Sequence, residues 1–386
     1  MGALVKGAPE IKHHPSPGNL KNHAFCSADT LESEAAVRHV TDRYMYSFQT
    51  IETPLSELPL KDFIQLLPKT ENHLHLEGSC PWELLRHFAP TRFSLPPPFW
   101  APEFRWRHFD DFMDVFRMDL APFFTTPEAY YDASRIILRR CAEQNVKYVE
   151  LGMHFAALLA MPGRERECLA AIHAAAPAGM ELRVLGGFLH DDRRPHLEGL
   201  MDAALEWPEL DGIDLHGPEY PPLESWSGEY WARAREAGKF TRAHAGEFMG
   251  PDFVKQVVEE LKVTRIMHGI RSIEDPALLP WLVERNVTFD ICPLSNLKLV
   301  AGGLESLAQH PLRRFLEAGL TCSISTDDTY LFGNSLTEEY EACHHDMAFT
   351  RAELVQLAIN GFLIAQWPTE AKLPYIEELH AIRDAL

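Results

Sequence analysis

Short apolar runs alternate with longer amphipathic segments along most of the chain beyond residue 70. Each run is rich in Val, Ile, Leu or Phe, whereas the later intervening segments space their apolar residues three or four positions apart. This alternation is typical of βα units built around parallel strands. Eight such runs occur, over residues 71–78, 146–155, 181–190, 212–217, 240–247, 265–270, 288–296 and 321–328.

Eight strand–helix units predict an α/β fold of the closed (β/α)8, or TIM barrel, type. Their extent of roughly 260 residues matches the usual size of such a barrel. A doubly wound open sheet is the alternative, but it requires a glycine-rich phosphate-binding turn after the first strand, and the sequence has none there.

A separate segment precedes the barrel. Residues 1 to about 25 contain prolines and glycines without apolar periodicity and are interpreted as a loose leader. The next apolar residues recur at helical spacing and predict an amphipathic helix: Leu31, Val37, Val40, Tyr44 and Phe48. The expected division is a leader and N-terminal helical extension over 1–60 and the barrel over 61–386.

The composition limits the cellular compartment and the kinds of partner that we expect for the protein. The formal charge of -20 makes a nucleic-acid or anionic-membrane partner unfavourable. The 7 cysteines include no CxxC pair, as expected of a reducing compartment. No apolar stretch approaches the ~20 residues of a membrane span. A cytoplasmic protein with a small-molecule substrate, no nucleic acid and no membrane is therefore predicted.

Polar side chains cluster where five of the eight predicted strands end. Because barrel enzymes place their chemistry at the carboxyl ends of the strands, we expect these groups to meet at one mouth. They are His73, His75 and Glu77 in the first run, His216 in the fourth, His244 and Glu247 in the fifth, His268 in the sixth, and Asp327 and Asp328 in the eighth.

His73 and His75 point to a metal. Side chains two residues apart lie on the same face of a strand, so both imidazoles can reach one ion. A catalytic zinc site uses nitrogen and oxygen ligands and keeps one position open. His244 and Asp327 are the best placed further ligands.

Six ordered segments resemble the signature segments of the adenosine deaminase family of metal-dependent purine deaminases. The resemblance covers roughly residues 66–367 and rests on KTENHLHLEGS, GIDLHGPE, TRAHAGE, RIMHGI, DICPLSN and SISTDD. It implies a (β/α)8 barrel with one Zn²⁺ per chain. The implied zinc ligands are His73, His75, His244 and Asp327.

The resemblance also implies roles in catalysis and substrate binding. Glu247 resembles the proton donor to the purine ring nitrogen, and His268 the histidine that orients and helps deprotonate the attacking water. Asp328 resembles the carboxylate that contacts the imidazole edge of the purine. The remaining substrate contacts are expected from His75, from the backbone N–H of Gly217, and from Glu77 on the sugar side, where many relatives have Asp.

Several positions differ from the family pattern at strand ends that shape the pocket. Gly152 and His154 stand where relatives often have Arg and Ser-Pro, His216 and Pro218 replace Ala and Asp, and Thr329 replaces Pro. No metal ligand is affected. A further segment spaces Phe109, Phe112 and Phe116 along one helix face, which is expected to form either an apolar lid or an ordinary outer core helix.

The expected reaction is zinc-dependent hydrolytic deamination of adenosine or 2′-deoxyadenosine to the 6-oxo purine and ammonia. Free adenine, an N6-substituted adenine and aminodeoxyfutalosine are alternative substrates. A binuclear metal hydrolase would have a lysine at the end of the fourth strand, where there is none. A non-catalytic purine-binding barrel would have lost a ligand or the acid, and none is missing.

Overall fold

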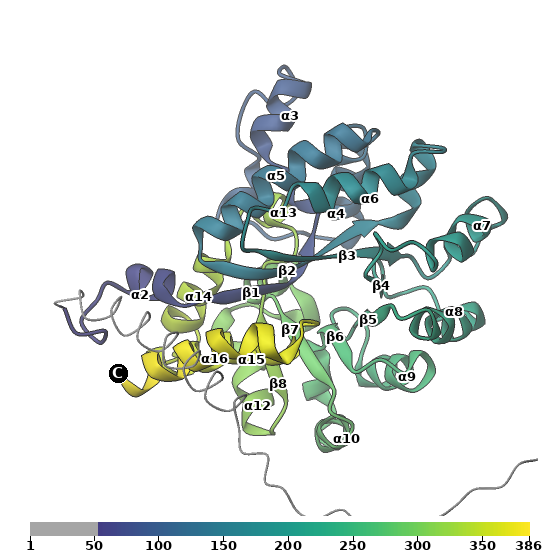
Figure 1. Ribbon diagram of the computed structural model, residues 1–386. Helices are drawn as coiled ribbons and strands as arrows, with labels where there is room; N and C mark the ends of the chain where they lie inside the picture. Colours follow the sequence, from purple (N-terminus) through teal and green to yellow (C-terminus); the bar gives the residue numbers. More distant parts are fainter. Residues whose placement is uncertain (1–52) are drawn as a thin grey trace, which may run out of the picture. The chain divides into compact units, whose positions relative to one another are not determined.

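The computed structural model describes residues 53–386, so the helix predicted within residues 31–48 lies outside the described part. Eight parallel strands form one sheet in chain order (Figure 1). They are β1 (Lys69–His75), β2 (Val146–His154), β3 (Glu181–Phe188), β4 (Gly212–Leu215), β5 (Phe240–Ala245), β6 (Arg265–His268), β7 (Thr288–Ile291) and β8 (Thr321–Ile324).

The sheet closes where β1 meets the segment that follows β8. Leu74 pairs with Asp327 in a parallel bridge. The Asp327 N–H donates to the His73 carbonyl at 2.9 Å, and the His75 N–H donates to the Asp327 carbonyl at 3.0 Å. The predicted (β/α)8 barrel is therefore confirmed, with a short seam that runs through three predicted metal ligands.

Helices surround the strands on the outside of the barrel (Figure 1). Several begin at sequence-encoded caps: Thr126 accepts from the Ala129 N–H before α5, and Thr350 and Glu353 form a capping box before α15. No helix of residues 53–386 is long and apolar enough to cross a membrane. The α-helices are α2 (Leu60–Leu66), α3 (Trp82–Phe88), α4 (Phe109–Val115), α5 (Pro127–Glu143), α6 (Glu165–Ala174), α7 (Pro195–Ala204), α8 (Ser225–Glu236), α9 (Pro251–Leu261), α10 (Leu278–Glu284), α11 (Pro293–Lys298), α12 (Leu312–Glu317), α13 (Thr329–Phe332), α14 (Leu336–His345), α15 (Arg351–Ile364) and α16 (Thr369–Asp384).

Each predicted run coincides with a strand, but every strand ends before its run does, and β1 begins at Lys69, two residues before the first run. β1 ends at His75, and Glu77, predicted on the same strand face, instead begins the 3-10 turn η1 (Glu77–Ser79). The chain leaves the sheet because Leu76 adopts a helical backbone conformation. β7 likewise ends at Ile291, and α11 starts at Pro293, whose fixed φ suits the first helical turn.

Charged side chains fill the barrel interior below the mouth. The guanidinium of Arg242 contacts Glu150 at 3.0 Å and Asp214 at 2.9 Å. Arg265 contacts the other oxygen of Glu150 at 2.6 Å and also Asp290 at 2.5 Å. Each of these charges is buried. Because buried charges need partners, the network ties β2, β4, β5, β6 and β7 together directly beneath the site.

Candidate active site

Three imidazoles converge at the mouth of the barrel. The Nε2 atom of His73 lies 3.2 Å from Nε2 of His75 and 3.0 Å from Nε2 of His244, and the last two are 3.2 Å apart. His73 and His75 share one face of β1 as predicted, and His244 comes from β5. Burial lowers the pKa of His73 and of His75 well below the usual value, which keeps both rings neutral and able to act as ligands.

A carboxylate oxygen completes this group. Asp327 Oδ1 lies 3.5 Å from Nε2 of His73 and 3.3 Å from Nε2 of His75. Its other oxygen accepts a 2.6 Å hydrogen bond from the Ser295 hydroxyl, which fixes the orientation of the carboxylate.

The four donors fit one metal ion. Ligands about 2.0–2.1 Å from a tetrahedral zinc ion lie about 3.3–3.4 Å from one another, close to the spacings observed here. Neutral imidazole nitrogens held this close together repel through their lone pairs unless a proton or a cation lies among them. The predicted ligands His73, His75, His244 and Asp327 therefore offer three nitrogens and one carboxylate to a single metal ion.

Neighbouring groups hold the ligand rings in place. The Nδ1 atom of His244 lies 3.2 Å from Asp214 Oδ1 and 3.0 Å from the Leu215 carbonyl, so Nδ1 carries the proton and Nε2 is free to bind. His73 Nδ1 lies 3.4 Å from the Cys292 sulfur. Burial acts to raise the pKa of Asp214, but Arg242 and His244 lower it below its usual value, so this carboxylate is ionised.

Glu247 and His268 lie beside the ligands. Nε2 of His268 is 3.5 Å from Glu247 Oε2 and 3.8 Å from Asp327 Oδ2. The Asn296 amide donates to Glu247 Oε1 at 2.9 Å. Burial, followed by repulsion from Asp327 and Glu219, raises the pKa of Glu247 well above its usual value. The raised pKa favours the protonated form of Glu247, which can donate a proton.

Glu219 holds the backbone on which Glu247 sits. Its buried carboxylate accepts hydrogen bonds from three successive N–H groups, those of Glu247 at 3.0 Å, Phe248 at 3.1 Å and Met249 at 2.6 Å. A carboxylate that binds successive amides in this way fixes the local chain direction, so Glu219 is a positioning residue for the acid.

Asp328 is packed against the 3-10 turn η1. A Cβ atom on Gly78 would lie only 1.5 Å from Asp328 Oδ1, so this position has to be glycine. Burial and the neighbouring charge of Asp327 raise the pKa of Asp328 well above its usual value. A protonated Asp328 can donate a hydrogen bond to an acceptor nitrogen of a substrate.

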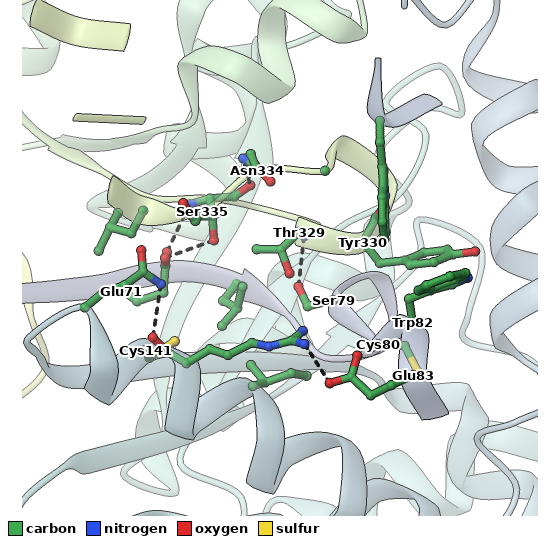
Figure 2. Close-up of a pocket in the computed structure, with 18 residues that line it drawn as sticks. Glu71, Ser79, Cys80, Trp82, Glu83, Cys141, Thr329, Tyr330, Asn334 and Ser335 are labelled. Carbon is green, nitrogen blue, oxygen red and sulfur yellow. Dashed lines mark hydrogen bonds and ion pairs between the residues drawn. The ribbon is translucent and has the colours of Figure 1, made fainter. Parts of the chain in front are cut away.

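Figure 2 shows a separate cavity, of about 340 Å³, whose lining includes Glu71, Ser79 and the residues on either side of the two aspartates, Thr326 and Thr329. Here the Ser79 hydroxyl accepts from the Thr329 N–H at 3.1 Å. Glu71 accepts from the N–H and the hydroxyl of Thr326 at 3.1 and 2.9 Å. These hydrogen bonds are made by the residues immediately before and after the two aspartates, Thr326 and Thr329. They hold Asp327 and Asp328 in a fixed position relative to β1.

The site opens into a cavity of about 250 Å³ that the predicted residues line. Phe109, Phe112 and Phe116 all face it, as expected of an apolar lid rather than of an outer core helix. Phe112 stacks on Phe332 and Phe109 packs on Phe248, with ring centres 5.6 and 4.7 Å apart, so the lid rests on the βα loops.

Glu77 and Gly217 also line this cavity. The Glu77 carboxylate is already engaged: it accepts from the Tyr130 hydroxyl at 2.8 Å and from the His154 N–H at 3.1 and 3.2 Å. Gly217 has φ of +85°, and a side chain there would collide with Leu189.

Sequence reasoning missed Asp214 and Glu219 as supports of the site. A signal for Asp214 was present, since it lies two residues before His216 in an otherwise apolar strand and so points to the same side of the barrel. Glu219 gave no such signal because it lies in a loop and acts on backbone groups 28–30 residues further along.

Converging nitrogen and oxygen donors with a buried acid at the mouth of a parallel (β/α)8 barrel can hold a metal ion and transfer a proton, as a hydrolase requires. The family model described as adenosine deaminase matches residues 68–382. The chain therefore belongs to the adenosine deaminase family, as the resemblance indicated, and is a deaminase acting on a small molecule.

Named relatives and solved structures show which proteins of this type the chain is similar to. An adenine deaminase of Sphingopyxis alaskensis is 32% identical over 318 residues, which cover 78% of this chain and 90% of the relative. The solved structure of an adenine deaminase from Arthrobacter aurescens matches with a TM-score of 0.72 and 27% identity, over 82% of this chain and 98% of that chain. An amidohydrolase from Burkholderia ambifaria, solved with bound Zn, shares the fold with a TM-score of 0.71 and 22% identity, over 86% of this chain and 98% of that chain.

Proposed function

We propose that this protein catalyses the zinc-dependent hydrolytic deamination of a 6-aminopurine, free adenine first, to the 6-oxo purine and ammonia. One observation carries the proposal: the Nε2 atoms of His73, His75 and His244 lie 3.0–3.2 Å apart, and Asp327 Oδ1 lies within 3.3–3.5 Å of the first two. The carboxyl of Glu247, with its raised pKa, lies beside them. A zinc ion is chosen because this donor set and its tetrahedral spacing suit it.

The reaction adds water to the ring carbon that bears the amino group and then expels ammonia. Zinc, when bound, supplies Lewis acidity that activates water at neutral pH. Glu247 donates its proton to the adjacent ring nitrogen, which makes that carbon electrophilic. His268, close to both Glu247 and Asp327, orients the attacking water and accepts its proton. Asp328 holds the imidazole edge of the purine.

Two observations support free adenine, in preference to a nucleoside, as the proposed substrate. Two of the relatives above are named adenine deaminases. In addition, both Glu77 oxygens are engaged with Tyr130 and the His154 backbone, so Glu77 has less capacity to accept from a ribose hydroxyl. Adenosine or 2′-deoxyadenosine, N6-substituted adenines and aminodeoxyfutalosine are the further substrates to compare.

Ammonia release from a substrate panel tests the proposal. Protein saturated with excess zinc and then freed of unbound metal is incubated with adenine, adenosine, 2′-deoxyadenosine and N6-methyladenine, and its metal content is measured in parallel. We expect one metal per chain and the highest kcat/KM with adenine. Two metals per chain, or no ammonia from any of these compounds, contradicts the mononuclear deaminase.

A further inference from the structure

Two histidines outside the metal site face each other across the substrate cavity. His154 is the last residue of β2, and His216 follows β4 directly, so β3 runs between them. Nδ1 of His154 lies 3.3 Å from Nε2 of His216, with the ring centres 5.5 Å apart. Both rings line the cavity that holds Glu247 and Asp328.

Gly187 of β3 makes this contact possible. A Cβ atom on Gly187 would lie 2.5 Å from Cε1 of His216, so any other residue would push the ring away. The backbone of Gly187 pairs with His154 on one side and with Asp214 on the other. The imidazole pair is thus built into the sheet, and its separation is set by strand register.

The pair offers one hydrogen-bond donor and one acceptor to a ligand. Burial lowers the pKa of His154 to about 4, so its ring is neutral at pH 7, and the 3.3 Å contact between the two ring nitrogens requires one shared hydrogen. One N–H is used between the rings. Whichever ring donates it, one protonated and one unprotonated nitrogen remain, at Nε2 of His154 and Nδ1 of His216. Neither has another side-chain or backbone partner within residues 53–386.

The pair lies away from the reacting carbon. The ring of His216 is 5.7 Å from that of His75, whereas His154 lies beyond it, 6.3 Å from the lid residue Phe116. A purine with its amino carbon at the metal site and its Glu247 and Asp328 contacts in place turns its N3/N9 edge toward this wall. In free adenine this edge carries one acceptor, N3, and one donor, N9–H.

We propose that His154 and His216 bind the N3/N9 edge of the unsubstituted purine base and make the enzyme discriminate against purines substituted at N9. The inference rests on the proposed deamination. It assigns to these two histidines a role in specificity, because a site that hydrogen-bonds N9–H leaves a buried polar atom unpaired when that hydrogen is replaced.

Comparison of adenine with 9-methyladenine isolates this contact, since the methyl group removes the N9 hydrogen without adding a sugar. The wild-type protein should prefer adenine by about 100-fold in kcat/KM. In His154→Ala, kcat/KM for adenine should fall at least tenfold while that for 9-methyladenine changes less than threefold. His154→Gln, whose amide has both a donor and an acceptor, should recover part of the preference.

Metal content and a matched variant complete the experiment. His154→Ala should retain one zinc, since its ring lies farther from the ligands than that of His216, and the exposed His87→Ala should match the wild type throughout. An equal loss of kcat/KM on both substrates would mean that His154 only supports the fold and would overturn the inference. An unchanged preference would overturn it too. A wild-type protein inactive on both purines would instead refute the proposed deamination, and the inference with it.

Discussion

His268 and Asp327 have backbone conformations that side-chain-bearing residues rarely adopt. Their φ angles are +66° and +69°. Such left-handed residues cost about 1–3 kcal/mol each and persist only where the surroundings hold them. Asp327 is held by its two hydrogen bonds to β1. This conformation turns the side chains of His268 and Asp327 toward the three ligand histidines at the point where the strands end. Local backbone strain therefore positions these two groups.

Glu247→Gln tests the proton donor directly. The amide has nearly the same shape and can still hydrogen-bond to a ring nitrogen, but it cannot transfer a proton. We expect kcat to fall by about 10²–10⁴-fold, because proton donation is required in the transition state. Zinc content and the affinity for the product hypoxanthine should remain close to wild type. A variant with wild-type kcat would remove Glu247 from the donor role.

Residue patterns in the sequence predicted the convergence of the four proposed ligands more readily than the residues that support them. His73 and His75 were predictable because a period of two places them on one strand face, and His244 and Asp327 because they end strands of the same barrel. Asn296, which contacts Glu247, lies in the helix α11. The sequence pattern had instead assigned this residue to the seventh strand. Its role depends on where the chain turns, which local periodicity does not specify.

At the scale of elements, η1 and the β8–α13 segment form one interlocked unit. Gly78→Ala should separate them, because the new methyl group would overlap the Asp328 carboxylate. We expect kcat/KM to fall at least tenfold while the metal is retained, since none of the four ligands is touched. Steady-state kinetics with metal analysis measures both effects.

Gly199→Ala is the matched control for this substitution. Gly199 lies within α7, and a Cβ atom there would meet no atom within 4 Å. Replacing a glycine inside a helix by alanine stabilises by roughly 0.5–1 kcal/mol. This variant should therefore be fully active and slightly more stable. If Gly78→Ala is as active as Gly199→Ala, the packing of Asp328 on η1 does not matter for catalysis.

The elements themselves were largely predictable, whereas their ends were not. Eight apolar runs, separated by amphipathic segments, suffice to predict eight parallel strands, because each strand is buried on both faces and is therefore apolar along its length. Strand ends depend on where hydrogen bonding to a neighbour stops, as at Leu76, and on residues such as Pro293 that favour a helix. These contacts are set by partners distant in sequence, so the first and seventh strands were predicted too long at their carboxyl ends.

On the scale of the whole molecule, the proposed metal ligands span the seam that closes the barrel. His73 and His75 lie on β1, Asp327 follows β8, and only a short bridge joins these segments. Removal of the metal should therefore loosen the seam more than the rest of the sheet. We expect hydrogen exchange at the amides of His75 and Asp327 to accelerate at least tenfold on chelation and to recover on zinc reloading. Equal acceleration at Leu185 in β3 would refute a local effect.

Lys69 links stability to pH. Its ammonium group donates to the carbonyls of Ile64 and Leu67 at 2.7 and 2.8 Å. Burial lowers its pKa from 10.5 to about 7. The unfolded chain thus binds more protons between these values, and this group makes folding more favourable as pH rises through the window, by up to about 1.4 kcal/mol per unit.

Lys69→Met removes this dependence while preserving an unbranched side chain. Denaturant unfolding at pH 7, 8, 9 and 10 gives the free energy of unfolding of both proteins. The wild-type value minus the variant value should increase with pH, and it should be flat below pH 7. A difference that is constant across the range would show that Lys69 titrates normally in the folded state.

The acidic and basic side chains of the barrel interior are distributed unevenly between the two halves of the chain. Strands β1–β4 contribute the carboxylates of Glu150 and Asp214, whereas β5 and β6 contribute both guanidiniums that neutralise them. Two copies of the first half would bring acid against acid at the centre of the barrel. Two copies of the second half would keep the ion pair of Arg265 with Asp290 but would leave Arg242 without its carboxylates. The halves are therefore complementary pieces, and duplication of either one could not rebuild this enzyme.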